Sequence, residues 1–587
     1  MVTRYRPRLR RDDPFVAISC DNSLAFKTGT QRSERPVFIN KIAPCRHACP
    51  IGIDISTAFH LASQGDIDGA LRTYLQDNPL PGVCGRVCYH PCEAECSRGN
   101  FDESISIRSF ERFLSDHGQV DIRGDVPIHS RKEKIAVIGS GPAGLSSSYH
   151  LARLGYQVTI FEGRSEIGGM LRYGIPSYRL PRSVLDRDIQ RIRSLGIDIQ
   201  GNTTVGKEVS WKELASFDAI FLAVGLQSGK ILFEPFGVES AVITGVEFLA
   251  DPQKWSLDDS TQKTLIIGGG NVAIDAARTL LRVRNGNGSN ITVICPESRD
   301  QMPALPEEVN EALEEGIRIV NGWAPDKLHR KDGKLVSLDF YQAEIRIDEA
   351  SGTLEIMRAG KEVQKHLADK LIVAIGQGME SDILPPGIEV KGGKVVVDEW
   401  GRTSLPKFFA GGDAIGEKAF VADAIASGKR GALAISCFLR GRDADTEFQA
   451  YHLGKSHTFS FRHFIEGPEK DLVDLKRVVS FDHINTLFFC ESPRNNPDRL
   501  DPGTRKSTFE EVTRGLEPRQ MEEEIARCFR CGTCIDCENC LDFCPDISII
   551  KDARLGMYGF DSDYCKGCGM CSVACPRGVV EMVEETT

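Results

Sequence analysis

The sequence predicts a multidomain protein in which two Rossmann-like α/β domains lie between an α-helical domain near the N-terminal end and a small α+β domain at the C-terminal end. Three observations carry this prediction. Patterns of strand and helix alternate from Lys134 to about Arg440, as they do in doubly wound α/β domains. Two glycine-rich turns of the dinucleotide-binding kind lie within that region. Cysteines at metal-ligand spacing gather on both sides of it.

A chain of 587 residues is long enough for several domains, each with a core of its own. Composition and motif positions divide it into six segments. These are 1–130, an N-terminal arm and helical cysteine-rich domain; 131–262 and 373–440, the two parts of a split α/β domain; 263–372, a second α/β domain inserted between them; 441–520, a linker or docking segment; and 521–587, the small C-terminal domain. The strands within 217–225 and 370–376 are expected to carry the chain between the two α/β domains.

The charge and hydropathy of the chain exclude two classes of partner. A net charge of −11 and a pI near 5.7 argue against nucleic acid, whose binders usually carry a basic face. No run of 18 apolar residues occurs, so no membrane span is expected. Five arginines near the start lack a following apolar stretch, so neither a secretory nor a twin-arginine signal is complete: Arg4, Arg6, Arg8, Arg10 and Arg11.

The use of cysteine indicates a reducing compartment. Sixteen of the 20 cysteines fall in two groups with metal-ligand spacing, which favours a cytoplasmic protein over a disulfide-bonded one. The remaining four stand alone and are expected to be inert thiols: Cys20, Cys295, Cys437 and Cys490.

Eight cysteines near the C-terminal end form two runs of the pattern CxxCxxCxxxCP. The runs are Cys534, Cys537, Cys540 and Cys544, then Cys565, Cys568, Cys571 and Cys575. Two [4Fe–4S] clusters require this spacing, because the first three thiolates of a run hold one cluster and the fourth reaches the other cluster. Zinc is the alternative, but its sites usually pair two CxxC motifs across a longer gap. The segment is therefore expected to resemble a bacterial ferredoxin and to handle single electrons.

The first glycine-rich turn belongs to a complete βαβ pattern over residues 134–162. Gly139 permits the tight turn, Gly141 lets the backbone approach a pyrophosphate, and Gly144 lets helix and strand pack closely. Pro142 and Ala143 complete the turn at the helix N-terminus, which faces the anion. Glu162 lies 23 residues after Gly139, where a carboxylate accepts ribose hydroxyls. A dinucleotide site is expected here.

A second copy of the pattern occupies 264–281, and its second strand follows at 291–295. Its turn contains Gly268, Gly270, Asn271, Val272 and Ala273, with Gly268, Gly270 and Ala273 in the three glycine roles. Two such domains in one chain suggest that one holds a flavin and the other a nicotinamide. A degenerate repeat that binds nothing is the alternative.

A third motif assigns these roles. The stretch 407–416 contains a strand, a glycine pair and Asp413, and a helical stretch follows at 419–438. It resembles the second FAD motif of flavoproteins with two dinucleotide domains. That resemblance implies that Gly412 and Asp413 contact the ribityl–pyrophosphate region of FAD, and that the split domain is the FAD domain.

Over roughly 41–440 the chain resembles the small subunit of NADPH-dependent glutamate synthase and its relatives, including the N-terminal half of dihydropyrimidine dehydrogenase. The resemblance is carried by APCRHACPIGIDI (43–55), NPLPGVCGRVCYHPCEAEC (78–96), GGMLRYGIPSYRLP (168–181) and the two FAD motifs. It implies that Gly169 and Met170 lie close to the flavin. The ferredoxin-like end resembles acceptor-reducing members, some of which serve dissimilatory sulfite reductase or 2-oxoacid:ferredoxin oxidoreductases.

The chain departs from that family in its N-terminal cysteines. Relatives keep a CxxC pair shortly before the APC segment, whereas here a similar segment contains Cys528 and Cys531. We hypothesise that this segment folds back, so that Cys528 and Cys531 join two N-terminal cysteines, Cys45 and Cys96, in one [4Fe–4S] cluster. The resemblance implies a neighbouring cluster with these ligands: Cys49, Cys88 and Cys92, with either Cys84 or Glu111 as the fourth. The alternative is that Cys528 and Cys531 are spare thiols and the N-terminal domain holds a single cluster.

A second departure concerns the nicotinamide. NADPH-using relatives place two arginines after the second strand, where this chain has Pro296 and Glu297. Each lost charge-assisted hydrogen bond is worth roughly 1.5–3 kcal/mol, and Glu297 repels a 2′-phosphate but accepts from a free 2′-hydroxyl. The sequence therefore predicts NAD(H) in preference to NADP(H). Arg299 remains and is expected to allow some use of NADPH.

These inferences together predict an NADH:acceptor oxidoreductase that passes electrons between NAD(H), FAD and three or four [4Fe–4S] clusters, to or from a ferredoxin or a partner redox enzyme. No residue is expected to act as an acid, base or nucleophile, and no CxxC follows the first turn for disulfide reduction. The rivals are a glutamate synthase small subunit, a flavin-bifurcating transhydrogenase subunit and an electron-relay scaffold with an inactive nicotinamide site. A homodimer and a heteromeric complex both remain open.

Overall fold

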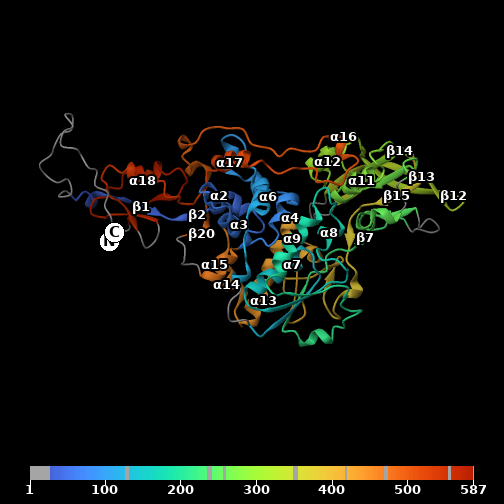
Figure 1. Ribbon diagram of the computed structural model, residues 1–587, viewed down its shortest axis with the longest axis horizontal. Helices are drawn as coiled ribbons and strands as arrows, with labels where there is room; N and C mark the ends of the chain where they lie inside the picture. The colour runs from blue at the N-terminus through green and yellow to red at the C-terminus, as the bar shows by residue number, and fades with distance from the viewer. Residues whose placement is uncertain are drawn as a thin grey trace.

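The structure is a computed structural model that describes most of the chain. The described residues are 27–125, 131–233, 241–255, 259–347, 354–416, 419–455, 457–467, 473–552 and 557–585. The arginines at the start of the chain and Cys20 lie outside them. Figure 1 shows an elongated molecule with the ferredoxin-like end at one extreme and a long β-hairpin region at the other.

Short helices form the cysteine-rich N-terminal domain. They are α1 (Pro44–Ala48), α2 (Ile55–Ser63), α3 (Ile67–Leu75), α4 (Pro81–Val87), α5 (Pro91–Ala94) and α6 (Ile107–His117). Asp54 and Asp66 precede α2 and α3 and accept hydrogen bonds from backbone N–H groups of the first turn. The apolar faces meet at Phe59 and Phe110, whose ring centroids lie 3.8 Å apart and whose side chains are fully buried. This packing holds the cysteine loops between the helices.

The first sheet has five parallel strands. Their order is β19 (Phe408–Ala410), β6 (Ala219–Leu222), β3 (Lys134–Ile138), β4 (Gln157–Phe161) and β5 (Asp198–Gln200). Strand β6 is apolar throughout and fully buried, as expected of a parallel sheet covered on both faces. Helices α7 (Pro142–Arg153) and α13 (Val421–Leu439) pack against each other on this sheet, and Gly428 allows the contact because a side chain there would strike the backbone of Ala143.

The second sheet is also parallel and five-stranded. Its order is β11 (Arg318–Asn321), β10 (Ile291–Cys295), β9 (Thr264–Ile267), β15 (Lys370–Val373) and β8 (Val242–Thr244). Helices α11 (Asn271–Val283) and α12 (Pro306–Glu314) cover it, and α10 (Gly245–Ala250) follows β8. The predicted start of this unit at residue 263 is wrong, because β8 pairs with β15 as an edge strand of the same sheet.

The chain passes between the two sheets twice. The outward segment contains β7 (Ser228–Gly229) and the returning segment contains β16 (Gln377–Gly378), and the two pair antiparallel. Beyond the second sheet, a three-stranded antiparallel sheet of β12 (Trp323–Lys331), β13 (Lys334–Ile347) and β14 (Leu354–Leu367) forms the far end of the molecule (Figure 1). The crossing therefore follows β6 rather than occurring within it.

Residues 441–520 are more than a linker. They contain α14 (Ala444–Tyr451), α15 (Phe461–Glu466), β20 (Val473–Val478) and α16 (Pro502–Arg505). Strand β20 pairs with β2 (Asn40–Ile42), and α16 lies beside α12 of the second sheet, reached by a long extended stretch that Figure 1 shows in orange. The segment thus connects units that the sequence analysis treated as separate.

The ferredoxin-like end begins after α17 (Pro518–Arg527). It contains α18 (Asn539–Asp542), β21 (Ile549–Asp552), β22 (Met557–Phe560), α19 (Met570–Val573) and β23 (Val580–Glu584). Strand β1 (Glu34–Phe38) pairs antiparallel with β23, so the predicted grouping of the first 130 residues as one unit is wrong for this strand. None of the helices in the described part of the chain combines the length and the hydropathy that crossing a bilayer requires.

Candidate functional site

A cavity of about 780 Å³ lies between the two parallel sheets. It is lined by residues from both glycine-rich turns, from the 168–175 segment and from the motif that follows β19. The predicted cofactor residues that line it are Gly139, Gly141, Pro142, Ala143, Glu162, Gly169, Met170, Gly270, Asn271, Val272, Gly412 and Asp413. The fold therefore brings the three nucleotide motifs to one space.

The first turn has the geometry that its three glycines predict. Gly139 has φ +100°, and a β-carbon there would lie 2.4 Å from the carbonyl oxygen of Ala223. A β-carbon on Gly144 would lie 2.0 Å from the carbonyl oxygen of Gly139, whereas Gly141 faces open space. The turn thus exposes its backbone and the N-terminus of α7 to the cavity, as a pyrophosphate requires.

The second turn repeats this arrangement. Gly268 has φ +136°, and a β-carbon there would lie 2.2 Å from the carbonyl oxygen of Ala374. Gly270 faces open space, and Ala273 is fully buried behind it. The side-chain oxygen of Asn271 accepts a hydrogen bond from the backbone N–H of Leu305 at 2.9 Å. The second turn, like the first, therefore leaves its backbone open to the cavity.

Two buried carboxylates occupy matching positions beside the turns. Glu162 accepts hydrogen bonds from the backbone N–H of Ser140 at 3.0 Å and from that of Arg164 at 2.9 Å. At the second turn, a β-carbon on Gly269 would lie 2.5 Å from Oε2 of Glu297. This oxygen is buried and finds no hydrogen-bond donor among the described residues. Buried acceptors are normally satisfied, so the Glu297 oxygen suits a hydroxyl donor from a ligand.

Arg299 lies apart from this group. Its guanidinium donates to the side-chain oxygen of Asn310 at 2.8 Å and contacts the sulfur of Met302 at 3.8 Å. Neither Arg299 nor Glu297 lines the cavity itself, and Glu297 stands directly behind the turn. The structure thus separates the two residues that the sequence analysis considered together.

The FAD motif after β19 and the 168–170 segment face each other across the first turn. Gly412 has φ +71° and its N–H donates to the hydroxyl of Ser427 at 2.7 Å. Burial raises the pKa of Asp413, and Lys394 partly opposes that effect. Gly169 has φ +53°, and a β-carbon there would lie 2.8 Å from Cα of Gly141. A β-carbon on Gly412 would lie 3.0 Å from the β-carbon of Ala143, so both segments approach the pyrophosphate turn closely.

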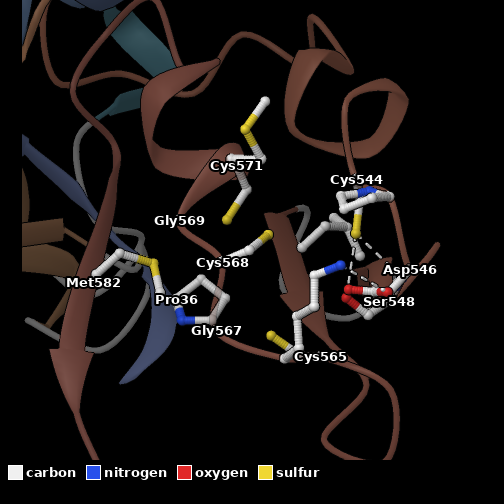
Figure 2. A pocket seen from close by; sticks show the side chains of 14 residues that line it. Pro36, Cys544, Asp546, Ser548, Cys565, Gly567, Cys568, Gly569, Cys571 and Met582 are labelled. Atoms are coloured by element: carbon white, nitrogen blue, oxygen red, sulfur yellow. Dashed lines mark hydrogen bonds and ion pairs between the residues drawn. The ribbon is translucent and has the colours of Figure 1, made fainter. Parts of the chain in front are cut away.

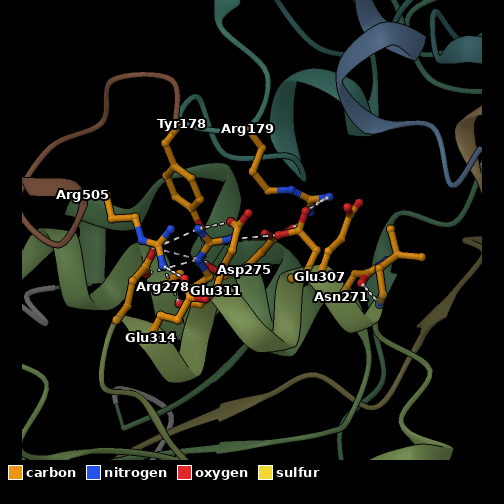
Figure 3. Close-up of polar contacts among 12 residues, drawn as sticks. Tyr178, Arg179, Asn271, Asp275, Arg278, Glu307, Glu311, Glu314 and Arg505 are labelled. Carbon is orange, nitrogen blue, oxygen red and sulfur yellow. Dashed lines mark hydrogen bonds and ion pairs between the residues drawn. The ribbon is translucent and has the colours of Figure 1, made fainter. Parts of the chain in front are cut away.

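An ion network joins the first sheet's domain to the second (Figure 3). Arg179 pairs with Asp275 of α11 at 2.7 Å and with Glu308 of α12 at 2.9 Å. Arg278 of α11 is fully buried and continues the network to several α12 carboxylates. Arg505 of α16 reaches the same helix by pairing with Glu314. Sequence reasoning did not find this network, because its members carry no recognisable spacing.

The fold-back of the C-terminal segment is present. Burial raises the pKa of the Cys45 thiol, and the nearby thiols of Cys96, Cys531 and Cys528 raise it further. Arg98 anchors the folded-back C-terminal segment by donating to the backbone oxygen of Arg527 at 2.9 Å. The thiols of two N-terminal and two C-terminal cysteines thus lie close together: Cys45, Cys96, Cys528 and Cys531.

A second group of thiols lies next to the nucleotide cavity. Burial raises the pKa of Cys92, and Cys49 and Cys88 raise it further. Val87 lines the cavity, and Cys88 of this thiol group is the next residue in the chain. The thiol group therefore lies close to the wall of the cavity. Cys84, Glu111 and Asn78 complete the group: Asn78 donates to Glu111 at 2.7 Å, and burial raises the pKa of Glu111 to about 8.

The ferredoxin-like end brings its eight cysteines together crosswise. Burial raises the pKa of Cys540, and Cys575, Cys534 and Cys537 raise it further. Burial likewise raises the pKa of Cys571 to about 11, with further contributions from Cys565, Cys544 and Cys568. Figure 2 shows this second group around its cavity, with Pro36 and Met582 from β1 and β23 beside it. No three described His, Cys, Asp or Glu side chains are spaced closely enough to hold a single metal ion.

Three of the solitary cysteines lie within the described residues. Burial raises the pKa of Cys295 to about 12 and that of Cys437 to about 11, so both stay protonated at neutral pH. Cys490 is exposed.

Comparison with known proteins gives matches over most of the chain. The family model for pyridine nucleotide-disulphide oxidoreductases matches residues 133–428. The model for dihydropyrimidine dehydrogenase domain II, 4Fe-4S cluster, matches 21–121, and a 4Fe-4S binding domain matches 558–581.

Several curated proteins are similar. The NADP(+)-dependent formate dehydrogenase subunit beta of Moorella thermoacetica is 36% identical over 528 residues, covering 83% of this chain and 70% of that protein. The NADPH-Fe(3+) oxidoreductase subunit beta of Geobacter sulfurreducens is 32% identical, covering 87% and 78%. The NAD-dependent dihydropyrimidine dehydrogenase subunit PreT of Escherichia coli K12 is 34% identical, covering 68% and 92%. Among solved structures, Mycobacterium tuberculosis FprA in complex with NADPH matches 53% of this chain and 85% of its own, with 18% identity and a TM-score of 0.46.

Proposed function

The chain belongs to the pyridine nucleotide-disulphide oxidoreductase family and is an iron–sulfur flavoprotein oxidoreductase, and from that premise we propose that it exchanges electrons between NADH and a partner redox protein through FAD and four [4Fe–4S] clusters. The family name describes the fold, since no CxxC lies within the matched residues 133–428 of this chain. The observation that carries the proposal is the order of the four ligand groups, which begins at the wall of the nucleotide cavity and ends in the ferredoxin-like domain.

The residues of the cavity fit two dinucleotides. FAD and a nicotinamide, when bound, supply hydride chemistry, and [4Fe–4S] clusters supply single-electron chemistry. In our proposal the turns at Gly141 and Gly270 bind the two pyrophosphates through their open backbone, and Asp413 binds the ribityl region of FAD. The protein's task is to hold the two ring systems against each other and to exclude water from between them.

The ligand groups suggest a direct route away from the cavity. Cys88 follows Val87, which lines the cavity, so its group is the first on the route. The group of Cys45 is next, and Cys45 contributes to the raised pKa of Cys92 in the first group. Cys531 belongs to this second group and Cys534, three residues later, belongs to the third. Neighbouring groups are therefore linked by a few residues of chain.

We assign the four ligand sets accordingly. They are Cys49, Cys88, Cys92 and Glu111; Cys45, Cys96, Cys528 and Cys531; Cys534, Cys537, Cys540 and Cys575; and Cys544, Cys565, Cys568 and Cys571. We prefer Glu111 to Cys84 because burial raises the pKa of this carboxyl to about 8, so its charged form is costly here unless a bound metal compensates the charge. Within the described residues its side chain accepts a hydrogen bond from the neutral amide of Asn78.

The choice of NADH follows from Glu297. Its buried Oε2 finds no donor among the described residues, a free 2′-hydroxyl of the adenosine ribose would supply one, and the charge of Glu297 opposes a 2′-phosphate. The names of the relatives include both NADP(+)-dependent and NAD-dependent enzymes, so similarity alone does not decide the matter. Arg299 points to Asn310 instead of the turn, which weakens its expected help for NADPH.

The partner in this proposal is a redox enzyme subunit or a ferredoxin, in the reducing cytoplasm. Relatives carry names of subunits of formate dehydrogenase, an iron(III) oxidoreductase and dihydropyrimidine dehydrogenase, and we infer that this chain also works within a complex. Its ferredoxin-like end supplies the contact, because that end holds the ligand groups farthest from the cavity.

NADH-dependent reduction of a viologen dye by the anaerobically purified chain tests the proposal. We expect reduction with NADH and a lower KM for NADH than for NADPH. A protein that holds FAD and iron but reduces no dye with either nucleotide would instead be an electron-relay scaffold with an inactive nicotinamide site. A KM for NADPH at or below that for NADH contradicts the assignment of Glu297.

A further inference from the structure

Lys429 lies in the middle of α13 and is almost completely buried, with 1% of its surface exposed. Its ammonium donates to the backbone oxygen of Ile51, to Oδ1 of Asp77 at 2.8 Å and to the backbone oxygen of Phe459 at 2.8 Å. Three acceptors match the three N–H donors of an ammonium group, whereas a neutral amine has only two. The nitrogen also lies 4.7 Å from the centroid of the Phe459 ring, a distance at which an aromatic face attracts a cation. Burial lowers the pKa of Lys429, but the pair with Asp77 opposes that effect, and the three acceptors favour the charged form.

The backbone oxygen of Ile51 that accepts from Lys429 belongs to the loop that follows Cys49. In this loop the backbone N–H of Gly52 donates to the backbone oxygen of Cys49 at 3.0 Å. Two oxygen atoms of the same loop accept from buried cations. Lys429 holds the oxygen of Ile51, and Arg46 holds that of Gly52 at 3.2 Å. The two cations thus hold the loop next to Cys49 in place and put positive charge beside it.

Helix α13 also touches the nucleotide cavity. Val421 and Ala424, in its first turn, line the cavity, and Lys429 follows five residues after Ala424. One rigid helix therefore spans from the flavin site to the loop of Cys49. Asp77 holds the other side of this contact, since its carboxylate also accepts from the backbone N–H of Phe461 at 3.1 Å.

We propose that Lys429 is a positioning residue that raises the reduction potential of the cluster held by Cys49, Cys88 and Cys92, and that Asp77 opposes it. The inference rests on the ligand set proposed above. A reduced cluster carries one more negative charge than an oxidised cluster, so a buried cation nearby favours reduction and a buried anion disfavours it. The first electron acceptor after the flavin is thereby made easier to reduce.

The test is a potentiometric titration followed by electron paramagnetic resonance on the full chain with its cofactors. The signal of this cluster is identified as the one lost in Cys88→Ser. We expect a more negative midpoint in Lys429→Met and a more positive midpoint in Asp77→Asn. Each shift should change the ratio of reduced to oxidised cluster at fixed potential by tenfold or more, which corresponds to about 59 mV for one electron.

Lys41→Met is the matched control. Lys41 is also a buried lysine that donates to a backbone oxygen, that of Gly578 at 2.7 Å, and pairs with Glu581 in the ferredoxin-like end. Its removal should leave the midpoint of the Cys88-dependent signal unchanged. If the Lys429→Met protein loses the cluster, the test uses Lys429→Arg and Asp77→Asn instead. The arginine variant should then keep a midpoint near that of the wild type.

The inference is overturned if the midpoint shifts in the same direction in Lys429→Met and Asp77→Asn, or if it shifts in neither folded variant. Only an electrostatic role predicts shifts of opposite sign for the loss of a cation and the loss of an anion. If Cys88→Ser keeps all cluster signals, the proposed ligand set is wrong and the inference falls with it. If that signal is lost in Cys88→Ser but does not move in the charge variants, the ligand set stands and only the role of Lys429 is refuted.

Discussion

Arg108 of α6 donates two hydrogen bonds to Glu307 of α12, at 2.6 and 3.0 Å, and so joins the cysteine-rich domain directly to the second parallel sheet. The same guanidinium donates to the backbone oxygen of Cys88 at 3.3 Å. One side chain thus connects a proposed cluster ligand to the domain that holds the proposed nicotinamide site. Together with the pair of Arg179 and Asp275, this contact holds the second sheet at two places.

Removal of the Glu307 charge should weaken this connection. Burial raises the pKa of Glu307, but Arg108 outweighs that effect and lowers the pKa to about 2. A lowered folded-state pKa means that the contribution to stability is present above the ordinary value of 4.5 and is lost as the pH falls toward about 2. We expect Glu307→Gln to cost about 1–3 kcal/mol of unfolding free energy at neutral pH and to lose this acid dependence.

Thermal unfolding by circular dichroism between pH 3 and pH 7 measures that effect. Glu510→Gln removes an exposed carboxylate and serves as the control. A difference between Glu307→Gln and the wild type that stays constant as the pH falls would contradict the assigned role of the ion pair.

Glu297 should decide the preference for the nicotinamide. In Glu297→Ala the 2′-hydroxyl loses a charged acceptor, worth roughly 1.5–3 kcal/mol, so kcat/KM for NADH should fall by about tenfold or more. The value for NADPH should fall less or rise, because a repulsive charge is removed. Steady-state kinetics with both nucleotides provides the measurement, and Arg299→Ala, whose guanidinium contacts Asn310, is the control. Equal losses for NADH and NADPH would show that Glu297 does not recognise the 2′-position.

Cys528 should be required for one complete cluster. Cys528→Ser is expected to lower the iron content of anaerobically purified protein by the equivalent of one [4Fe–4S] cluster while the ferredoxin-like clusters remain, because their eight ligands are separate. Cys490→Ser changes an exposed solitary thiol and should leave the iron content unchanged. Unchanged iron in Cys528→Ser would mean that the two cysteines of the folded-back C-terminal segment, Cys528 and Cys531, are spare thiols.

Glu111 and Cys84 are distinguished by a pair of variants. Glu111→Ala should abolish or alter the paramagnetic signal of the cluster next to the cavity, because it removes the buried carboxylate assigned as the fourth ligand. Cys84→Ser should keep that signal, since Cys84 lies within α4, one turn before Cys88. The reverse outcome would assign the fourth position to Cys84.

Local motifs account for the parts of the fold that the sequence predicted well. The two glycine turns lie where expected, each with one glycine in the left-handed region and one that faces the cavity. The eight C-terminal cysteines meet crosswise as their spacing predicts. Such local geometry can be read from the sequence because a few consecutive residues of backbone determine it.

Other features depended on contacts between distant parts of the chain. The second sheet begins at β8 rather than at residue 263, because a three-residue strand acquires its place only by pairing with β15. Residues 441–520 contain β20, which pairs with β2, and α16, which lies against α12. Their composition resembles a linker because each element is short and most of its partners are elsewhere.

The sequence by itself determined the kinds of chemistry that this protein can perform: two dinucleotide turns and sixteen cysteines at ligand spacing, each specified by residues close together in the chain. Only the tertiary structure decided the neighbours of these sites. It brought Cys528 to Cys45, set Cys88 directly after Val87 of the cavity wall and buried Lys429 against the loop of Cys49. The physical reason is that spacing along the chain fixes local geometry, whereas the approach of distant residues depends on which surfaces pack together when the whole chain folds.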